Sequence, residues 1–275
     1  MAHLKLTPLK LGTWRKIALG TWRTVGDPTV YATFEINVTK ILARQKKWTE
    51  TKGTRAPTLT TIVAKATANT LKKHPQINGM IRWGKIYLRD SVTLFLQTAV
   101  DDEGTELSGV TIPNAENKSI EEISAELLKK AQAIRQDKDP AFKKTKSMFS
   151  VVPAFLMRYL LNFSSYILYT LNINPPFLGL PKDPFGSIMI TSVGMLGVDE
   201  AYAPLVPYSR VPMLLAICAT RDTPIVVDGK ITIAPIFKVC GTFDHRFVDG
   251  VYGAKMLKTV KSLLETDEGL DKIGM

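Results

Sequence analysis

The chain has 275 residues, 45% of them hydrophobic and 22% charged, a composition typical of a globular protein with one large domain or two average ones. Its 36 Lys and Arg outnumber 25 Asp and Glu, which gives a formal net charge of +11. This excess fits an ordinary basic protein, or an anionic ligand such as a nucleotide-bearing thioester, an acidic carrier protein or an anionic membrane surface. No nucleic-acid partner is expected, because the basic residues are scattered and form no recognition motif.

The cysteines and the N-terminus indicate the compartment. Cys218 and Cys240 both lie in apolar, strand-like runs, so we expect buried, reduced thiols. Such thiols fit a reducing compartment, the cytoplasm or, in a eukaryote, the mitochondrial matrix. The first residues contain no apolar core followed by a cleavage site, so no signal peptide is expected. The 3 His and 2 Cys lack metal-ligand spacing, and no metal is expected.

The first half of the chain predicts alternating helices and strands. The helix that begins at Thr58 carries an apolar stripe and ends before Pro75, because the residue before a proline avoids helical angles. The helix that begins at Ser119 has Glu122 three residues on, which completes a capping box. In chain order, the predicted elements are a first helix starting near 14–16, a strand at 34–38, a basic helix at 40–48, the Thr58 helix, a hairpin of 81–83 and 85–88, a strand at 92–100 and the Ser119 helix.

A hydrophobic run, residues 148–173, follows a charged linker at 138–146. It is rich in Phe, Leu, Ile, Val and Tyr, but Arg158 and Asn162 near its middle weaken the case for a membrane span. We expect a buried or partner-facing helical hairpin, and keep open an element that contacts a membrane surface or a hydrophobic ligand.

The last third of the chain predicts strands and one closing helix. Asp228-Gly229 between two apolar runs is a strong signal for a tight hairpin. The expected strands cover 187–193, 213–219, 225–227, 231–233 and 236–243. The closing helix at 251–265 is expected to turn Ala254, Leu257, Val260 and Leu264 inward, and a polar tail to follow at 266–275. Helices and strands mix without strict alternation, which predicts an α+β fold with helices packed on a large mixed sheet.

His245 is the best candidate for a catalytic residue. It lies between a strand-like run and an amphipathic helix, with Asp244, Arg246 and Asp249 as charged neighbours. A histidine in such a place exchanges protons near neutral pH. His3 and His74 lack this setting, and we interpret them as structural.

The segment Thr242-Phe243-Asp244-His245-Arg246-Phe247-Val248-Asp249-Gly250 resembles the signature that closes the catalytic domain of dihydrolipoyl acyltransferases, the cores of 2-oxo acid dehydrogenase complexes. Chloramphenicol acetyltransferase shares that fold and a related signature. The similarity extends from about residue 14 to 265, with an interruption between roughly 140 and 185. Supporting matches lie at 15–18, 74–78, 90–92 and 190–197.

The resemblance implies a single acyltransferase catalytic domain over 1–275, with a hydrophobic helical insertion at about 137–183 and the chloramphenicol acetyltransferase-like fold. Such enzymes move an acyl group between coenzyme A and a thiol or hydroxyl. By similarity, His245 is the general base and Thr191 the donor to the oxyanion, with Ser192 as an alternative donor. Only one of these two can serve, because neighbouring strand residues point to opposite faces.

The resemblance also implies supporting residues and an assembly. Asp249 is expected to form a structural ion pair with Arg15, and Arg246 to support the motif. The family's active site lies between the subunits of a homotrimer, so His245 is expected to face a neighbour's Thr191. The polar tail suggests an assembly that stops at three subunits. Residues that contact coenzyme A stay unassigned.

The chain departs from the family in two ways. It shows no lipoyl domain and no Ala/Pro-rich linker, so we expect a free-standing catalytic domain. Its acyl group then comes from acyl-CoA or from a separate lipoyl or acyl carrier protein, alongside other 2-oxo acid dehydrogenase components. The insertion is interpreted as a lid, an acyl-chain surface or a trimer contact. The alternative to an enzyme is a non-catalytic scaffold that docks a partner or membrane through this insertion. Antibiotic acetylation fits less well, because the Asp244-His245-Arg246 form resembles the dihydrolipoyl type.

Overall fold

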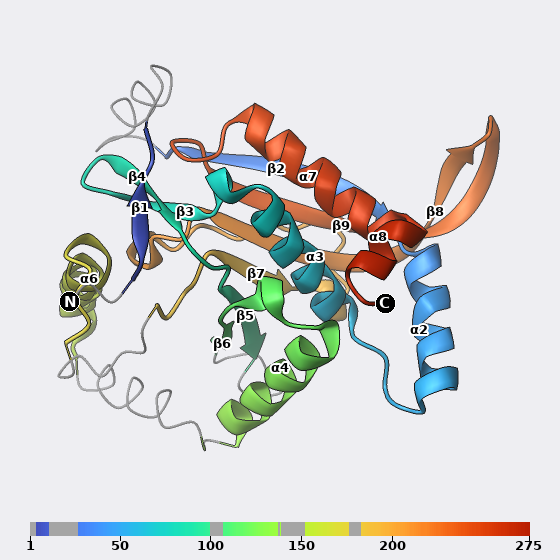
Figure 1. The fold of residues 1–275 in the computed structure, drawn as a ribbon, viewed down its shortest axis with the longest axis horizontal. Helices are drawn as coiled ribbons and strands as arrows, with labels where there is room; N and C mark the ends of the chain where they lie inside the picture. Colours follow the sequence, from blue (N-terminus) through green and yellow to red (C-terminus); the bar gives the residue numbers. More distant parts are fainter. Residues whose placement is uncertain (1–3, 11–26, 100–106, 137, 139–151, 176–182) are drawn as a thin grey trace.

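A six-stranded mixed sheet forms the centre of the chain (Figure 1). The structure is a computed structural model and describes residues 4–10, 27–99, 107–136, 138, 152–175 and 183–275. In spatial order the strands are β2 (Thr29–Asn37), β9 (Lys230–Asp244), β8 (Met213–Val227), β7 (Ile188–Ser192), β5 (Leu94–Ala99) and β6 (Leu107–Ile112). Strand β7 runs parallel to β5 and β8, and the other pairs are antiparallel. The predicted mixed sheet is confirmed.

A second, three-stranded sheet lies beside the first. Its order is β1 (Leu6–Pro8), β4 (Lys85–Arg89) and β3 (Gly79–Arg82), with antiparallel pairing throughout. The predicted hairpin between β3 and β4 is confirmed. Its two turn residues, Trp83 and Gly84, have φ of 51° and 66°, the left-handed conformation that a tight two-residue hairpin requires.

Helices pack on one face of the large sheet, where α3 and α7 cross in front of the strands in Figure 1. The helices of this layer and its edge are α2 (Thr39–Lys52), α3 (Leu59–Lys73), α4 (Ile120–Arg135), α7 (Gly250–Glu265) and α8 (Asp267–Lys272). Single 3-10 turns lie at Pro75–Ile77, Ala115–Asn117, Gly194–Leu196 and Pro207–Ser209. Alternate residues of the strands, such as Met213, Leu215 and Ile217 of β8, are buried beneath these helices.

Local signals placed the ends of two helices correctly. The Thr58 hydroxyl accepts a hydrogen bond from the Thr61 amide at 3.2 Å, and α3 ends at Lys73 as predicted. The Ser119–Glu122 capping box is confirmed, because each side chain accepts a hydrogen bond from the other residue's backbone amide.

The prediction for the last third of the chain split its strands in the wrong places. Four of them form only two long strands, β8 and β9, joined at the predicted Asp228-Gly229 turn. The apolar runs are interrupted because the far half of this hairpin leaves the body of the molecule, as Figure 1 shows. There Val226, Ile231 and Ile233 are 73–80% exposed.

The expectations about the C-terminus are confirmed in part. Val260 and Leu264 of α7 are buried and Leu257 packs against the core as predicted, whereas Ala254 is exposed and Met256 is buried. The polar tail was not predicted to form a helix. It folds into α8, whose Leu270 is buried, and the following Ile273 is buried as well, so both join the main core.

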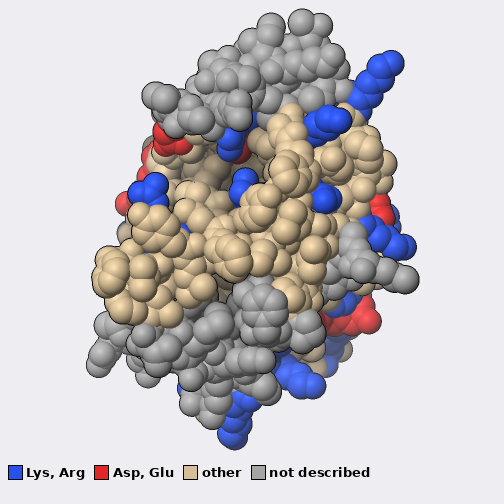
Figure 2. Space-filling view, turned by 90° about the vertical axis from the view of Figure 1, so that its left-hand side faces the viewer, with Lys and Arg blue, Asp and Glu red and all other residues tan. Residues whose placement is uncertain are grey.

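The described part of the hydrophobic run is a single helix. Helix α6 (Ala154–Ser165) continues into a π-helical turn (Tyr166–Thr170), so residues 152–175 do not form the expected hairpin. Phe155, Tyr159 and Phe163 repeat every four residues along α6 and are 74%, 70% and 56% exposed. Figure 2 views the molecule from the side where α6 lies in Figure 1 and shows a broad uncharged surface with scattered basic side chains. Most of the predicted linker at 138–146 and the predicted first helix lie outside the described residues.

Candidate active site

His245 lies in the turn between β9 and α7. Strand β9 pairs with β2 as far as Asp244, and the backbone amide of His245 then donates to the carbonyl of Pro28 at 2.8 Å. The imidazole is half-buried, and its Nδ1 lies 3.0 Å from the carbonyl oxygen of Val248. The end of a central strand therefore holds both the backbone and the ring of this histidine.

The contact with Val248 determines which ring nitrogen carries the proton. A carbonyl oxygen only accepts hydrogen bonds, so Nδ1 of His245 must be the donor. In the neutral ring, Nε2 is then unprotonated and able to accept a proton. This tautomer is the one that a general base acting through Nε2 requires.

Asp244 and Arg246 flank the histidine and bind each other. The Arg246 guanidinium donates from Nε to Oδ1 at 3.0 Å and from Nη2 to Oδ2 at 2.7 Å. The Arg246 amide donates to the same Oδ1 at 3.0 Å. The Asp244 carboxylate raises the pKa of Arg246, so the guanidinium stays charged. Sequence analysis assigned Arg246 a supporting role but did not identify this partner.

Asp249 caps the helix that follows the site. Its Oδ1 accepts a hydrogen bond from the Tyr252 amide at 2.9 Å at the N-terminus of α7. The expected ion pair with Arg15 lies outside the described residues. The cap links the orientation of α7 to the turn that carries His245.

Thr191 and Ser192 end β7 and point to opposite faces of the sheet. Ser192 alternates with Ile188 and Ile190, which are buried beneath the helices. Thr191 lies on the other face with Met189 and with Ala216, its partner on β8. Both hydroxyl-bearing residues are half-buried, and only Thr191 faces away from the helical layer.

Thr191 and His245 of the same chain lie far apart. Thr191 is level with Ala216 and, one strand further, with Cys240, four residues before the end of β9. Strand rise and strand spacing then separate Thr191 from Asp244 by roughly 16 Å. A base and an oxyanion donor that serve one carbonyl must each lie within about 3 Å of reacting atoms. One chain therefore does not bring the two residues together.

Two arginine contacts near these elements were not predicted. Arg210, whose φ is 58°, donates from Nε to the Ser165 hydroxyl at 3.1 Å and so ties α6 to the start of β8. Arg89 of β4 forms a bidentate ion pair with Asp183 just before β7, and both residues are buried. Each contact joins residues distant in sequence, and no motif signals it.

The remaining candidates for chemistry have structural roles. Cys218 and Cys240 are buried as predicted, and burial raises the pKa of Cys218 to about 11, so its thiolate is scarce at neutral pH. His74 Nε2 lies 2.9 Å from the Thr259 hydroxyl and links α3 to α7. Among the described residues, no three His, Cys, Asp or Glu gather as metal ligands. None of the described helices is long and apolar enough to cross a bilayer.

Sequence comparison identifies relatives of the chain. Residues 19–152 and 184–270 match the family model of the 2-oxoacid dehydrogenases acyltransferase catalytic domain. The acetyltransferase component of the acetoin cleaving system of Bacillus subtilis is 24% identical over 86% of this chain and 50% of that protein. The acetyltransferase component of the pyruvate dehydrogenase complex of the same organism is 26% identical over 86% and 45%. The chain thus spans about half the length of these curated relatives.

Solved structures show the same fold. A probable dihydrolipoamide acetyltransferase from Listeria monocytogenes superimposes with a TM-score of 0.65 at 18% identity, covering 97% of this chain and 95% of that one. Chloramphenicol acetyltransferase gives 0.57 at 14% identity, covering 95% and 100%. The predicted fold class is confirmed. By the extent of the family match, the chain belongs to the 2-oxoacid dehydrogenase acyltransferase catalytic-domain family.

Proposed function

We propose that this chain is a catalytic domain, over 1–275, that transfers an acyl group between coenzyme A and a thiol acceptor of the dihydrolipoyl type. The observation that carries the proposal is the hydrogen bond between His245 Nδ1 and the Val248 carbonyl, which leaves Nε2 as the basic nitrogen. Family membership supports the choice of acyl transfer. The family match stops at 152 and resumes at 184, which supports an insertion between these positions.

In the proposed reaction, His245 Nε2 takes the proton of the attacking thiol. The thiol's pKa near ~8.5 leaves little thiolate at neutral pH, so a positioned base speeds this step. The sulfur attacks the thioester carbonyl of acyl-CoA, and the Thr191 hydroxyl donates to the negative oxygen that forms. Collapse of this intermediate breaks the bond to the coenzyme A sulfur, which receives the proton back from His245. The same steps in reverse load coenzyme A from an acylated dihydrolipoyl carrier.

The proposed site is shared between chains in a homotrimer. The separation of roughly 16 Å between Thr191 and the end of β9 supports this arrangement, because a neighbouring chain must then supply Thr191. The projecting β8–β9 hairpin supports it too. Val226 pairs with Ile231, and both lie on an apolar face with Ile233 that a second copy would cover. A separate lipoyl carrier and other 2-oxo acid dehydrogenase components are the proposed partners.

An exchange assay tests the proposal. Purified protein is incubated with several acyl-CoAs and dihydrolipoamide, and thioester exchange is followed for the wild type and His245→Ala. The variant should react slower by about 10²–10⁴-fold, the usual contribution of a positioned base. Lys261→Ala, on an exposed part of α7, serves as the matched control and should exchange at the wild-type rate. Equal inertness of wild type and His245→Ala across all donors would contradict the proposal.

A second candidate function is a docking role for α6, with or without catalysis. The exposed aromatic stripe of Phe155, Tyr159 and Phe163 is the observation that favours it. Replacing all three by Ser keeps the buried side of α6 intact. This variant should then lose binding to liposomes or to a partner in co-sedimentation, and unchanged binding would sink the docking role.

A further inference from the structure

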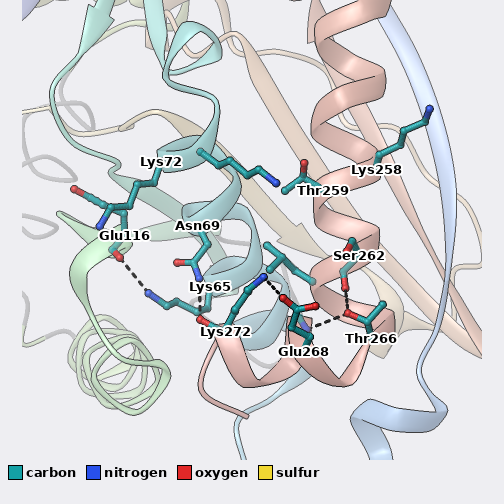
Figure 3. Close-up of a pocket in the computed structure, with 13 residues that line it drawn as sticks. Lys65, Asn69, Lys72, Glu116, Lys258, Thr259, Ser262, Thr266, Glu268 and Lys272 are labelled. Atoms are coloured by element: carbon teal, nitrogen blue, oxygen red, sulfur yellow. Dashed lines mark hydrogen bonds and ion pairs between the residues drawn. The ribbon is translucent and has the colours of Figure 1, made fainter.

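A lysine-rich groove lies between α3, α7 and α8, away from His245. Its volume is about 760 Å³, within the range that small-molecule sites occupy. Figure 3 shows side chains of α3 on one side of the groove and side chains of α7 and α8 on the other, with the Lys258 ammonium directed away from α3. Lys65, Lys72, Lys73, Lys258 and Lys272 contribute five ammonium groups, whereas Glu116 and Glu268 supply the two carboxylates of the lining.

The two carboxylates do not balance these charges. Glu268 pairs with Lys272 at 2.5 Å. Glu116 accepts hydrogen bonds from the Val92 amide at 3.0 Å and from Asn117 at 3.2 Å. Within the described parts of the chain, no carboxylate lies at ion-pair distance from the other four lysines of the groove. The lining therefore carries more ammonium groups than carboxylates and concentrates positive charge.

Lys65 gives the groove a buried cation. Its side chain rises from the middle of α3, and the residue is 7% exposed. Among the described residues, its Nζ reaches two backbone carbonyls, those of Ala115 at 3.4 Å and Glu116 at 3.3 Å, which are long contacts for an ammonium with three donors. Burial and the nearby Lys72 lower the pKa of Lys65, so its charge is costly. An anion in the groove would offset that cost.

We propose that this groove binds a small molecule bearing a diphosphate or other multiple phosphate group. Phosphate oxygens are multiple strong acceptors that match several ammonium donors at once. The Ser262 hydroxyl and the Asn69 amide line the same groove and offer further polar contacts. An acidic protein segment is the competing occupant. The buried Lys65 favours a small anion, because a segment lying across the helices would not reach it.

The groove is separate from the proposed acyl-transfer site. Lys258 lies eight residues into α7, about 12 Å along the helix from its N-terminus beside His245. Thr191 faces the opposite side of the sheet from α3 and α7. Binding here therefore does not depend on acyl transfer, and the two proposals can fail independently.

Calorimetric titration of the whole protein with pyrophosphate tests the site. Lys72→Ala/Lys73→Ala removes two exposed ammonium groups from the α3 side of the groove and should weaken binding about tenfold, the effect of two modest ion pairs. Lys46→Ala/Lys47→Ala removes the same charge from the exposed side of α2 and should bind as the wild type does. His245→Ala should also bind normally. Raising the salt concentration should weaken wild-type binding.

Further titrations distinguish the source of the phosphate. Tighter binding of ATP than of pyrophosphate, with competition between them, would support a free nucleotide as the ligand. Tighter binding of coenzyme A with the same competition, weakened by the groove double variant, would support its diphosphate arm. The proposal is overturned if wild-type protein binds none of the three at millimolar concentration, or if both double variants weaken binding equally. It is also overturned if only a poly-glutamate peptide binds.

Discussion

Asp244 and Arg246 form a bidentate ion pair on either side of His245, with the Arg246 amide bound to the same carboxylate. The carboxylate is almost buried, whereas part of the guanidinium reaches solvent. The three hydrogen bonds join the residues immediately before and after His245, across the turn that carries it. The pair thus orients the backbone from which the imidazole extends.

Arg246 is accordingly a positioning residue for the proposed reaction. Arg246→Gln should lower kcat by roughly ten- to a hundredfold with a smaller change in KM, because small displacements of a base are costly. Arg246→Lys should recover part of the loss, since it restores a charge for Asp244. Arg221→Gln breaks an exposed arginine–aspartate pair with Asp199 and should leave kcat unchanged. Equal kcat for Arg246→Gln and wild type would remove the positioning role.

Thr191 should matter more than Ser192. Thr191→Ala removes the proposed oxyanion donor and should lower kcat by about 10²–10³. Ser192→Ala alters a hydroxyl on the helical face and should have little effect on kcat. Steady-state exchange rates of the two variants identify the oxyanion donor. A larger loss of kcat in Ser192→Ala than in Thr191→Ala would assign that role to Ser192.

A mixing experiment tests whether the site is shared between chains. His245→Ala and Thr191→Ala chains are each expected to react at least about a hundredfold slower than the wild type. Refolded or co-expressed together, they should regain part of the activity, because mixed assemblies contain interfaces with one intact His245 and one intact Thr191. Absence of any recovery in assemblies shown to be mixed would contradict a site shared by His245 and Thr191 of neighbouring chains.

Asp249 is expected to act through both a helix cap and the proposed pair with Arg15. Asp249→Asn keeps an acceptor for the Tyr252 amide but loses the charge, whereas Asp249→Ala loses both. Loss of the cap costs about 1 kcal/mol, and loss of one member of a buried ion pair costs about 3–5 kcal/mol. Denaturant unfolding should therefore show a large loss in both variants. Near-normal stability of Asp249→Asn would contradict the ion pair.

The buried pair of Arg89 and Asp183 should stabilise the junction between the small sheet and β7. Removing either partner alone, as in Arg89→Met or Asp183→Leu, leaves a buried charge and should cost about 3–5 kcal/mol of unfolding free energy. The double variant should recover much of this loss, because no unpaired charge remains. Additive losses in the double-mutant cycle would show that the two residues are not coupled.

Lys65→Met should change how stability depends on pH. The lowered pKa of Lys65 means that the folded chain releases this proton at a lower pH than the unfolded chain, whose lysine titrates near 10.5. Wild-type stability should therefore rise as the pH increases from the folded-state pKa to about 10.5. Below that window Lys65 is charged in the folded and the unfolded chain, and burying the charge destabilises the folded chain. Lys65→Met should therefore equal or exceed wild-type stability at neutral pH. The variant's gain should shrink as the pH approaches 10.5, and a constant difference would contradict the burial of a charged lysine.

Features that depend on neighbouring residues were predictable. The Ser119–Glu122 capping box, the end of α3 before Pro75 and the Asp228-Gly229 turn all form from residues within a few positions of each other. The lengths of β8 and β9 were not predictable, because their outer halves project from the body, where no core imposes an apolar pattern. The burial of Leu270 and Ile273 was not predicted, because two apolar residues in a polar tail show neither helical nor strand periodicity. Both nevertheless pack into the main core.

The sequence by itself determined the family, the candidate base His245 and the helix ends that have local caps, since these depend on contiguous residues and on local backbone preferences. Tertiary structure decided which face of the sheet Thr191 occupies, that Arg89 meets Asp183, and that lysines of α3, α7 and α8 line one groove. Arg89 and Asp183 are 94 positions apart, and Asn69 and Lys272, which line the groove, are 203 positions apart. Spacing along the chain carries no information about them, because only the packing of helices on a paired sheet brings those residues together.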